Sequence, residues 1–150
     1  MELFHFDLAR TIDHIIHLMV AYGLALPLGM DREVSKFKFG LRTFPLVGVV
    51  SCGFMLVGMS VIDSTEGEAR IFEGIITGIG FIGGGAIITS KDKIMGTSSA
   101  ASIWNTGAIG LAVAYNRLEI AIVLSVLNVL TLWTLHSIKK TIEKRTDEEE

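Results

Sequence analysis

The stretch of residues 71–89, IFEGIITGIGFIGGGAIIT, is an apolar run as long as a membrane-spanning helix. Its one ionisable side chain, Glu73, lies near its start. In lipid, glycines let two helix backbones approach closely, and Gly74-x-x-x-Gly78 and Gly80-x-x-x-Gly84 both have the spacing of such contacts. Six glycines therefore predict intimate helix contact inside a membrane, with more close-approach surface than four neighbouring helices would use: Gly74, Gly78, Gly80, Gly83, Gly84 and Gly85.

The same glycines also fit a formal dinucleotide-binding pattern. Residues 78–83, GIGFIG, match G-x-G-x-x-G, which binds a pyrophosphate when it follows a strand and opens a helix. No alternating strand pattern precedes it, and Ile103 stands where the ribose-binding acid would be expected. We interpret the pattern as helix packing, so no nucleotide, no other cofactor and no nucleic acid is expected as a ligand.

The composition favours a membrane protein. Hydrophobic residues make up 50% of the chain and charged residues 19%, and the charges gather between apolar segments of spanning length. Five such segments are expected, at residues 11–29, 44–62, 71–89, 99–115 and 118–136. The loops between them are too short for a soluble domain. The sequence therefore predicts an all-α protein with a five-helix transmembrane domain at 1–136 and a charged cytoplasmic tail at 137–150.

The basic residues predict the orientation, because loops rich in lysine and arginine stay in the cytoplasm. The loops at 30–43 and 90–98, together with the tail, hold ten of the thirteen basic residues. These segments share one side of a five-span chain, and the other side has Arg10, Arg70 and Arg117. We expect the amino terminus outside and the carboxyl terminus in the cytoplasm.

The loop at 30–43 also has a helical pattern of its own. Val34, Phe37 and Leu41 recur at helical spacing, with lysines at other positions. This pattern predicts a short interfacial helix that lies on membrane lipids at the inner leaflet until Gly40 ends it.

Polar motifs are expected to meet at the cytoplasmic face, after helix one and at the starts of helices two and four: Asp31, Arg32, Glu33, Arg42, Thr43, Thr97, Ser98 and Ser99. Thr43 is placed to cap helix two, and Thr97 or Ser98 to cap helix four. A carboxylate from the end of helix one could dock on the unpaired N–H groups of helix four, beside an arginine. We favour a structural latch that joins helices one, two and four. The alternative is a site for a hydrated divalent ion or an anionic headgroup.

Four polar side chains fall within the predicted spans: Glu73, Asn105, Thr106 and Asn128. Interhelical hydrogen bonds are the expected role of the two asparagines and the threonine, and the alternative is the lining of a transport pathway. A local pair with Arg70 would account for Glu73. Asp13, His14 and His17 cluster near the outer end of helix one, but two histidines without clear further ligands do not predict a metal site.

The order and spacing of the motifs resemble the MgtC/SapB family of membrane proteins. Its pattern reads roughly G-x-E-R-E, G-L-R-T, G-I-G-F-L-G-A-G-A-I and R-G-L-T-T-A-A-S-L-W. This chain has GMDRE at 29–33, GLRT at 40–43, GIGFIGGGAI at 78–87 and MGTSSAASIW at 95–104. Its departures are Asp31, Met95 and the pair Ser98-Ser99. The soluble carboxyl-terminal domain of many relatives is not expected here, so no function of that domain is carried over.

The resemblance implies a bacterial inner-membrane protein associated with magnesium limitation and, in pathogens, with virulence. It also implies a regulator of other membrane systems. The glycine-rich helices and the short loops favour a regulator or scaffold that acts through helix contact with itself or with another inner-membrane complex, and packing through helix three predicts a homo-oligomer. The alternative is an oligomeric transporter or channel for Mg²⁺, protons or lipid. No enzyme is expected, because the spans contain no nucleophile with a base, no paired catalytic acids and no metal-ligand set.

Overall fold

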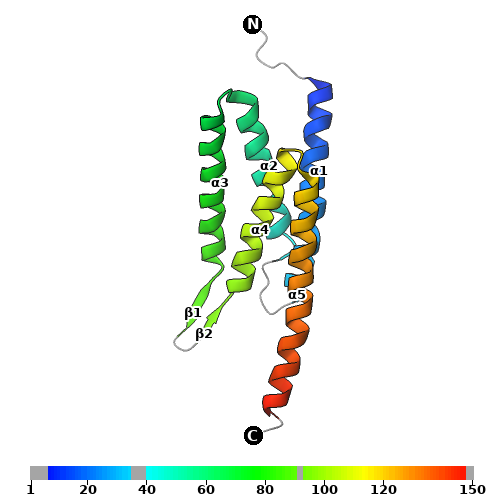
Figure 1. Ribbon diagram of the computed structural model, residues 1–150, viewed down its shortest axis with the longest axis vertical. Coiled ribbons are helices and arrows are strands. Elements are labelled where there is room, and N and C mark those ends of the chain that lie inside the picture. Colours follow the sequence, from blue (N-terminus) through cyan, green and yellow to red (C-terminus); the bar gives the residue numbers. More distant parts are fainter. Residues whose placement is uncertain (1–6, 35–39, 91–92, 148–150) are drawn as a thin grey trace.

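The computed structural model describes residues 7–34, 40–90 and 93–147, with side chains at 7–30, 40–89 and 94–134. The described residues form five helices, running alternately in opposite directions, and one β-hairpin (Figure 1). The all-α fold class with five helices is confirmed, and the hairpin is an element that the sequence did not predict. In chain order the elements are α1 (Leu8–Val34), α2 (Thr43–Val61), α3 (Thr65–Gly85), β1 (Ile88–Ser90), β2 (Lys93–Met95), α4 (Thr97–Ala114) and α5 (Leu118–Asp147).

The helix ends agree closely with the predicted spans for α2 and α4, and less closely for α1 and α5. α2 and α4 begin and end within two residues of the predicted spans at 44–62 and 99–115. α1 extends beyond the predicted span at 11–29 at both ends. α5 reaches Asp147, so most of the predicted charged tail at 137–150 is helical. Apolar length therefore marks a span, whereas backbone hydrogen bonding continues a helix into polar residues as well.

The third helix differs from its predicted span at both ends. α3 begins at Thr65 instead of 71, because the Ser64 hydroxyl accepts a hydrogen bond from the Gly67 N–H at 3.2 Å. Two glutamates lie in its first turn, where the helix dipole stabilises negative charge. α3 ends at Gly85 instead of 89, and the residues that follow turn into the hairpin.

The hairpin replaces the simple loop predicted at 90–98. β1 and β2 pair in antiparallel register, with Ile88 opposite Met95. At the base of the hairpin, Gly96 has a φ angle of 88°, in the left-handed region that favours glycine. A side chain there would also overlap the carbonyl group of Ala86. Glycine at this position therefore lets the chain enter α4 directly from the hairpin.

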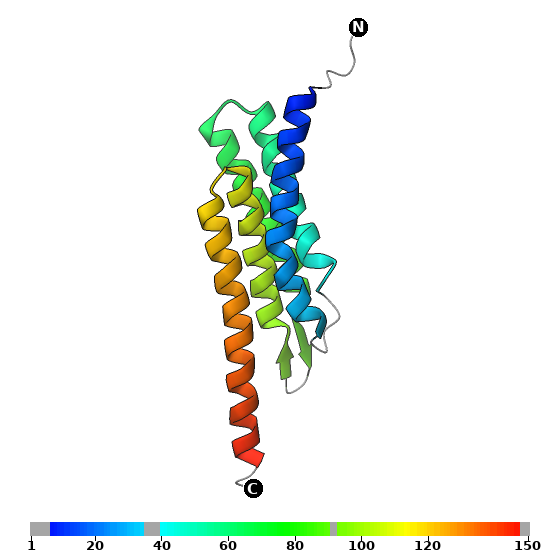
Figure 2. The same ribbon diagram turned by 90° about the vertical axis from the view of Figure 1, so that its right-hand side faces the viewer.

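α4 lies at the centre of the bundle and contacts each of the other four helices (Figure 2). Most of its residues are buried. A Cβ atom at Gly110 would overlap the carbonyl of Gly48 in α2, and one at Gly107 would overlap the side chain of Ile79 in α3. Close glycine packing therefore occurs mainly at α4, and not at the α3 glycines that the sequence emphasised.

The outer surface of the bundle is rich in large apolar side chains. Phe54 in α2 is 61% exposed and Phe81 in α3 is 85% exposed. Among the described residues, the helical segments Leu8–Met30 and Thr43–Val61 are long and apolar enough to cross a membrane, and Leu118–Thr134 is a shorter apolar helix. Such a surface exceeds the scattered apolar side chains of soluble monomers.

Candidate functional site

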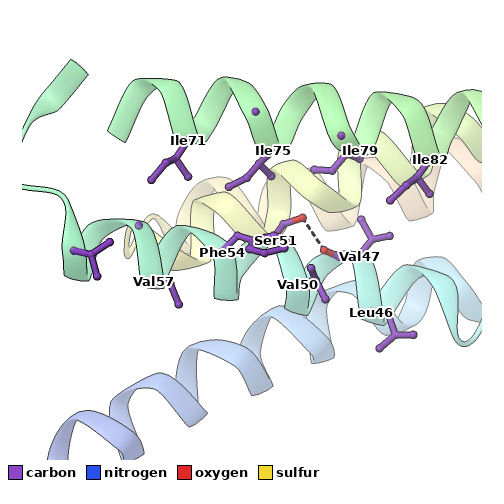
Figure 3. Close-up of a pocket in the computed structure, with 14 residues that line it drawn as sticks. Leu46, Val47, Val50, Ser51, Phe54, Val57, Ile71, Ile75, Ile79 and Ile82 are labelled. Carbon is purple, nitrogen blue, oxygen red and sulfur yellow. Dashed lines mark hydrogen bonds between the residues drawn. The ribbon is translucent and has the colours of Figure 1, made fainter. Parts of the chain in front are cut away.

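A groove of about 650 Å³ lies between α2 and α3 (Figure 3). Phe54 and Val57 line it from α2, and Ile75 lines it from α3. Of the described residues that line it, Ser51 alone has a hydroxyl group, and this group donates a hydrogen bond to the Val47 carbonyl of its own helix at 2.7 Å. The groove therefore fits an apolar helix face or a hydrocarbon chain, and not an ion or a polar substrate.

Two glycines of α3 line the groove and leave it open. Cβ atoms at Gly74 and Gly78 would lie more than 4 Å from any atom of the described residues, apart from the adjoining residues and backbone of α3 itself. The two helices touch near their connecting loop, where the Ile71 Cδ1 atom would lie 2.6 Å from a Cβ at Gly58. Beyond this contact the glycines give α3 a face of bare backbone toward α2.

The six α3 glycines for which the sequence predicts a packing role differ in their surroundings within this chain. Gly83 packs closely, since a Cβ there would lie 3.1 Å from the Ala100 carbonyl oxygen of α4. The other glycines face open space: Gly74, Gly78, Gly80, Gly84 and Gly85. The reason is that α3 lies at the edge of the bundle and packs on α4 mainly through one stripe, whose buried residues are Ile79 and Gly83.

The predicted cytoplasmic cluster is only partly described. The side chains of Asp31, Arg32 and Glu33 lie outside the described residues, as do residues 35–39, where the interfacial helix was expected. The backbone from the end of α1 meets the start of α2, since a Cβ at Gly29 would lie 2.8 Å from the carbonyl oxygen of residue 40. The latch and the interfacial helix therefore stay predictions.

The predicted helix caps in this cluster are wrong. Arg42, which is exposed, is the N-cap of α2, so Thr43 is already the first residue of the helix. Gly96 is the N-cap of α4, and neither helix has a side-chain cap hydrogen bond. At α4 the tight approach of Ala86 to Gly96 leaves no room for a capping side chain. Thr97 and Ser98 follow as exposed residues of the first turn, and Ser99 is buried.

A polar seam joins α4 to α5. The Asn105 amide donates to the Leu124 carbonyl at 3.3 Å, and the Ser102 hydroxyl donates to Asn128 Oδ1 at 3.0 Å. Both asparagines thus make the interhelical hydrogen bonds that the sequence predicted. Thr106 instead bonds within its own helix, to the Ser102 carbonyl at 2.8 Å. The Asn128 Nδ2 atom is buried without a partner among the described residues.

Glu73 does not form the predicted pair with Arg70: both side chains are exposed, and they make no ion pair in the described part of the chain. Because α3 begins at Thr65, Glu73 lies in the third turn of the helix instead of the first. Its backbone carbonyl accepts a hydrogen bond from the Thr77 hydroxyl at 2.9 Å.

The opposite end of the bundle has contacts that sequence reasoning missed. Buried His17 in α1 bonds through Nε2 to Asn116 Oδ1 at 3.0 Å, and through Nδ1 to the Asp13 carbonyl at 2.8 Å. In the same turn between α4 and α5, the Tyr115 hydroxyl bonds to the Glu68 carboxylate at 3.4 Å. The turn is thereby tied to α1 and α3. Among the described residues, no group of three or more His, Cys, Asp or Glu could hold a metal ion.

An all-α bundle with an apolar exterior, an apolar lateral groove and polar side chains paired between helices is typical of helical membrane proteins. Comparison with known proteins makes the assignment specific. The chain belongs to the MgtC family, which it matches over residues 18–141. No solved structure shows a significant match to it.

Three relatives show how far the similarity extends. The chain is 35% identical over 135 residues to the Escherichia coli K12 protein named "Putative magnesium transporter YhiD", covering 85% of this chain and 63% of that protein. It is 29% identical over 114 residues to protein MgtC of Salmonella typhimurium LT2, covering 76% and 48%. An uncharacterised Haemophilus influenzae protein is 26% identical over 149 residues, covering 89% and 61%. The chain thus spans less than two thirds of the length of these relatives.

Proposed function

We propose that this chain is a polytopic protein of the bacterial inner membrane, with five spans, the amino terminus outside and the carboxyl terminus in the cytoplasm. The apolar exterior and the family membership support the membrane location. The distribution of basic residues supports the orientation. A reporter that works only in the cytoplasm should be active when it is fused after Glu150. Activity of a reporter that works only after export, fused at the same position, would show that the orientation is the reverse of the one proposed.

Within that membrane, we propose a regulator or scaffold that acts through helix contacts and whose role is tied to magnesium supply. The α2–α3 groove is the observation that carries this function. Glycine destabilises a helix interior by roughly 1 kcal/mol relative to alanine. Gly74 and Gly78 have that cost, although no other described segment of the chain approaches the positions of their missing Cβ atoms. A helix of another chain would offset this cost by packing closely against the bare backbone at both glycines.

A second copy of the same chain is the occupant that the groove favours. Gly74 and Gly78 are one small-xxx-small step, and two copies related by a twofold axis would place these residues against each other. Ile71, Ile75 and Ile82 would then fill the groove of the partner copy with apolar volume. The proposed unit is therefore a homo-oligomer joined through α3.

Photocross-linking in native membranes tests this function. A photoreactive amino acid at Val57, which lines the groove and is 62% exposed, should give an adduct of twice the chain mass. Gly78→Leu should abolish the adduct, because the side chain fills the groove floor. Gly80→Leu is the matched control, since Gly80 also faces open space but does not line the groove.

The possible adducts separate the kinds of contact. An adduct of another mass that Gly78→Leu abolishes would replace the second copy with a different membrane protein and keep the regulatory function. Adducts with lipid alone, in both the parent and the Gly80→Leu protein, would contradict the helix-contact function.

Transport is the second candidate, and one observation favours it. In the described part of the chain, the buried Nδ2 atom of Asn128 has no hydrogen-bond partner, although it lies beside the Ser102 and Asn105 hydrogen bonds. The α4–α5 seam therefore has a polar group that can still bind a ligand. Purified protein in liposomes should then carry Mg²⁺, protons or lipid at a rate that Asn128→Leu reduces and Thr131→Val preserves. The Thr131 hydroxyl is a suitable control because it bonds within α5, to the Leu127 carbonyl. If the liposomes show no flux of Mg²⁺, protons or lipid, transport is excluded as the function.

We also propose that the polar residues of the cytoplasmic cluster form the latch between α1, α2 and α4. The close approach of Gly29 to residue 40 supports it, because it brings the helix ends that carry Asp31 and Arg42 together. Removing one partner of a charge-assisted pair costs more than removing both. Asp31→Asn should therefore lower abundance in the membrane, and Arg42→Gln added to it should restore part of the loss. Unchanged abundance in both variants would exclude the latch.

A further inference from the structure

The hairpin of β1 and β2 extends past the ends of α3 and α4, away from the packed helices (Figure 1). Its strands carry exposed apolar side chains: Ile94 is 67% exposed, Ile88 47% and Met95 38%. A two-stranded hairpin by itself is marginal in water. Exposed apolar side chains on such an element therefore indicate that the hairpin contacts lipid or protein as well as water.

The hairpin is held firmly to the bundle at its base. A Cβ at Gly96 would overlap the Ala86 carbonyl, so the strands leave and return through a tight contact. One turn further into the bundle, Gly83 packs against the Ala100 carbonyl. The position of the hairpin relative to the helix ends is therefore fixed by the fold.

The strand register distributes the apolar residues over both faces. Side chains of directly opposed residues share a face, so Ile88 and Met95 lie on one face and Thr89 and Ile94 on the other. The next pair toward the turn is Ser90 with Lys93, which is polar. The hairpin is thus apolar on both faces near the helices and polar toward its turn.

We propose that this hairpin is a lipid-contacting element that lies in the headgroup region of the bilayer and binds anionic lipid. The inference rests on the membrane location proposed above. Open sheet edges do not occur in the hydrocarbon core, whereas headgroups and interfacial water can bond free backbone groups. Apolar residues on two faces match lipid, which surrounds the element, better than a protein that adds to one edge. Lys93 of β2, the strand partner of Ser90, supplies a positive charge that complements anionic headgroups.

Depth-dependent fluorescence quenching tests the proposal on the purified full chain. A Cys52→Ala background removes the native thiol, which is buried, and a polarity-sensitive dye is placed singly at Ile94→Cys or Met95→Cys. The vesicles contain either phosphatidylglycerol with phosphatidylethanolamine, or phosphatidylcholine alone. Phe81→Cys marks a highly exposed site within α3, and Ser64→Cys marks the loop between α2 and α3.

We expect dye at both hairpin positions to emit at shorter wavelength than dye at Ser64→Cys. A quencher attached near the lipid headgroup should act on both positions more strongly than a quencher deep in the acyl chains. The effect should be larger in anionic vesicles. At Phe81→Cys the order of the two lipid quenchers should be reversed.

Aqueous iodide that quenches both hairpin positions as well as Ser64→Cys would overturn the inference. So would protection from iodide without quenching by lipid, which would indicate contact with a second copy. Equal results in the two kinds of vesicle would overturn the preference for anionic lipid. If Phe81→Cys is also quenched by iodide and not by lipid, the membrane location itself fails.

Discussion

α3 and α4 are both rich in small residues, yet they use them in opposite ways. In α4, Gly107 and Gly110 are covered by side-chain and backbone atoms of neighbouring helices. In α3, Gly74 and Gly78 face the groove, and the buried residues are Ile79 and Gly83. Glycine spacing predicts how closely a neighbouring helix can approach. It does not state whether that neighbour belongs to the same chain.

Gly110→Ala should give the largest loss of stability in the bundle. Its new Cβ would overlap the Gly48 carbonyl and lie 3.0 Å from the Cys52 backbone nitrogen, and neither is a movable side-chain end. Overpacking of this kind costs about 3 kcal/mol. We expect a correspondingly lower free energy of unfolding, measured by SDS titration in mixed micelles.

Gly80→Ala is the matched substitution in α3, where the new Cβ meets open space. It should raise the free energy of unfolding by up to about 0.8 kcal/mol through helix propensity alone. Equal losses in the two variants would mean that the contrast between α3 and α4 is wrong. A loss at Gly80→Ala alone would place a helix neighbour on the face of α3 that is open in this structure.

The contrast also explains how much could be predicted from the sequence. Five helices could be predicted because each apolar run has the length of a span, and their order follows from the short connections. The partner of each glycine could not, because it depends on the rotation of each helix about its axis. The hairpin was hidden for a similar reason: in the sequence, Ile88 and Thr89 of β1 continue the apolar run of α3 without a break.

The candidate site also has features that could be predicted from the sequence and features that could not. Asn105 and Asn128 were recognisable, because a polar side chain in an apolar run needs a hydrogen-bond partner. The bond from Ser125 to the Leu24 carbonyl, at 2.7 Å, joins residues about a hundred positions apart, and nothing in either local pattern indicates it. The α2–α3 groove was equally invisible, since its lining is ordinary apolar sequence.

Asn116→Val should give the next largest effect, in the turn between α4 and α5. Asn116 has a φ angle of 57°, which a β-branched side chain disfavours by about 2 kcal/mol. Asn116→Gly also loses the bond to His17 but accepts this backbone conformation. We expect the valine variant to unfold at lower denaturant than the glycine variant. Equal midpoints would show that the turn can change its conformation without cost.

Ser64→Ala should have a smaller effect, confined to α3. It removes the acceptor for the Gly67 N–H, a cap worth about 1 kcal/mol. Amide hydrogen exchange should accelerate in the first turn of α3, while α4 keeps its protection. Ser60→Ala is the control, because the Ser60 hydroxyl bonds to the Val57 carbonyl within α2. Faster exchange throughout α4 as well would mean that the two helices open as one unit.

The smallest effect should come from the pair Ser102 and Asn128, which joins α4 to α5. A double-mutant cycle with Ser102→Ala and Asn128→Ala should give a coupling free energy of about 0.6 kcal/mol, the usual value for such a bond between membrane helices. Thr106→Ala with Asn128→Ala is the control cycle and should show no coupling, because Thr106 bonds within α4. A coupling several times larger would mean that the unpartnered Nδ2 atom of Asn128 gains a ligand or a second chain in the membrane. The seam between α4 and α5 would then belong to a functional pathway. The bundle would have a polar binding position at this seam, in contrast to the apolar groove beside α3.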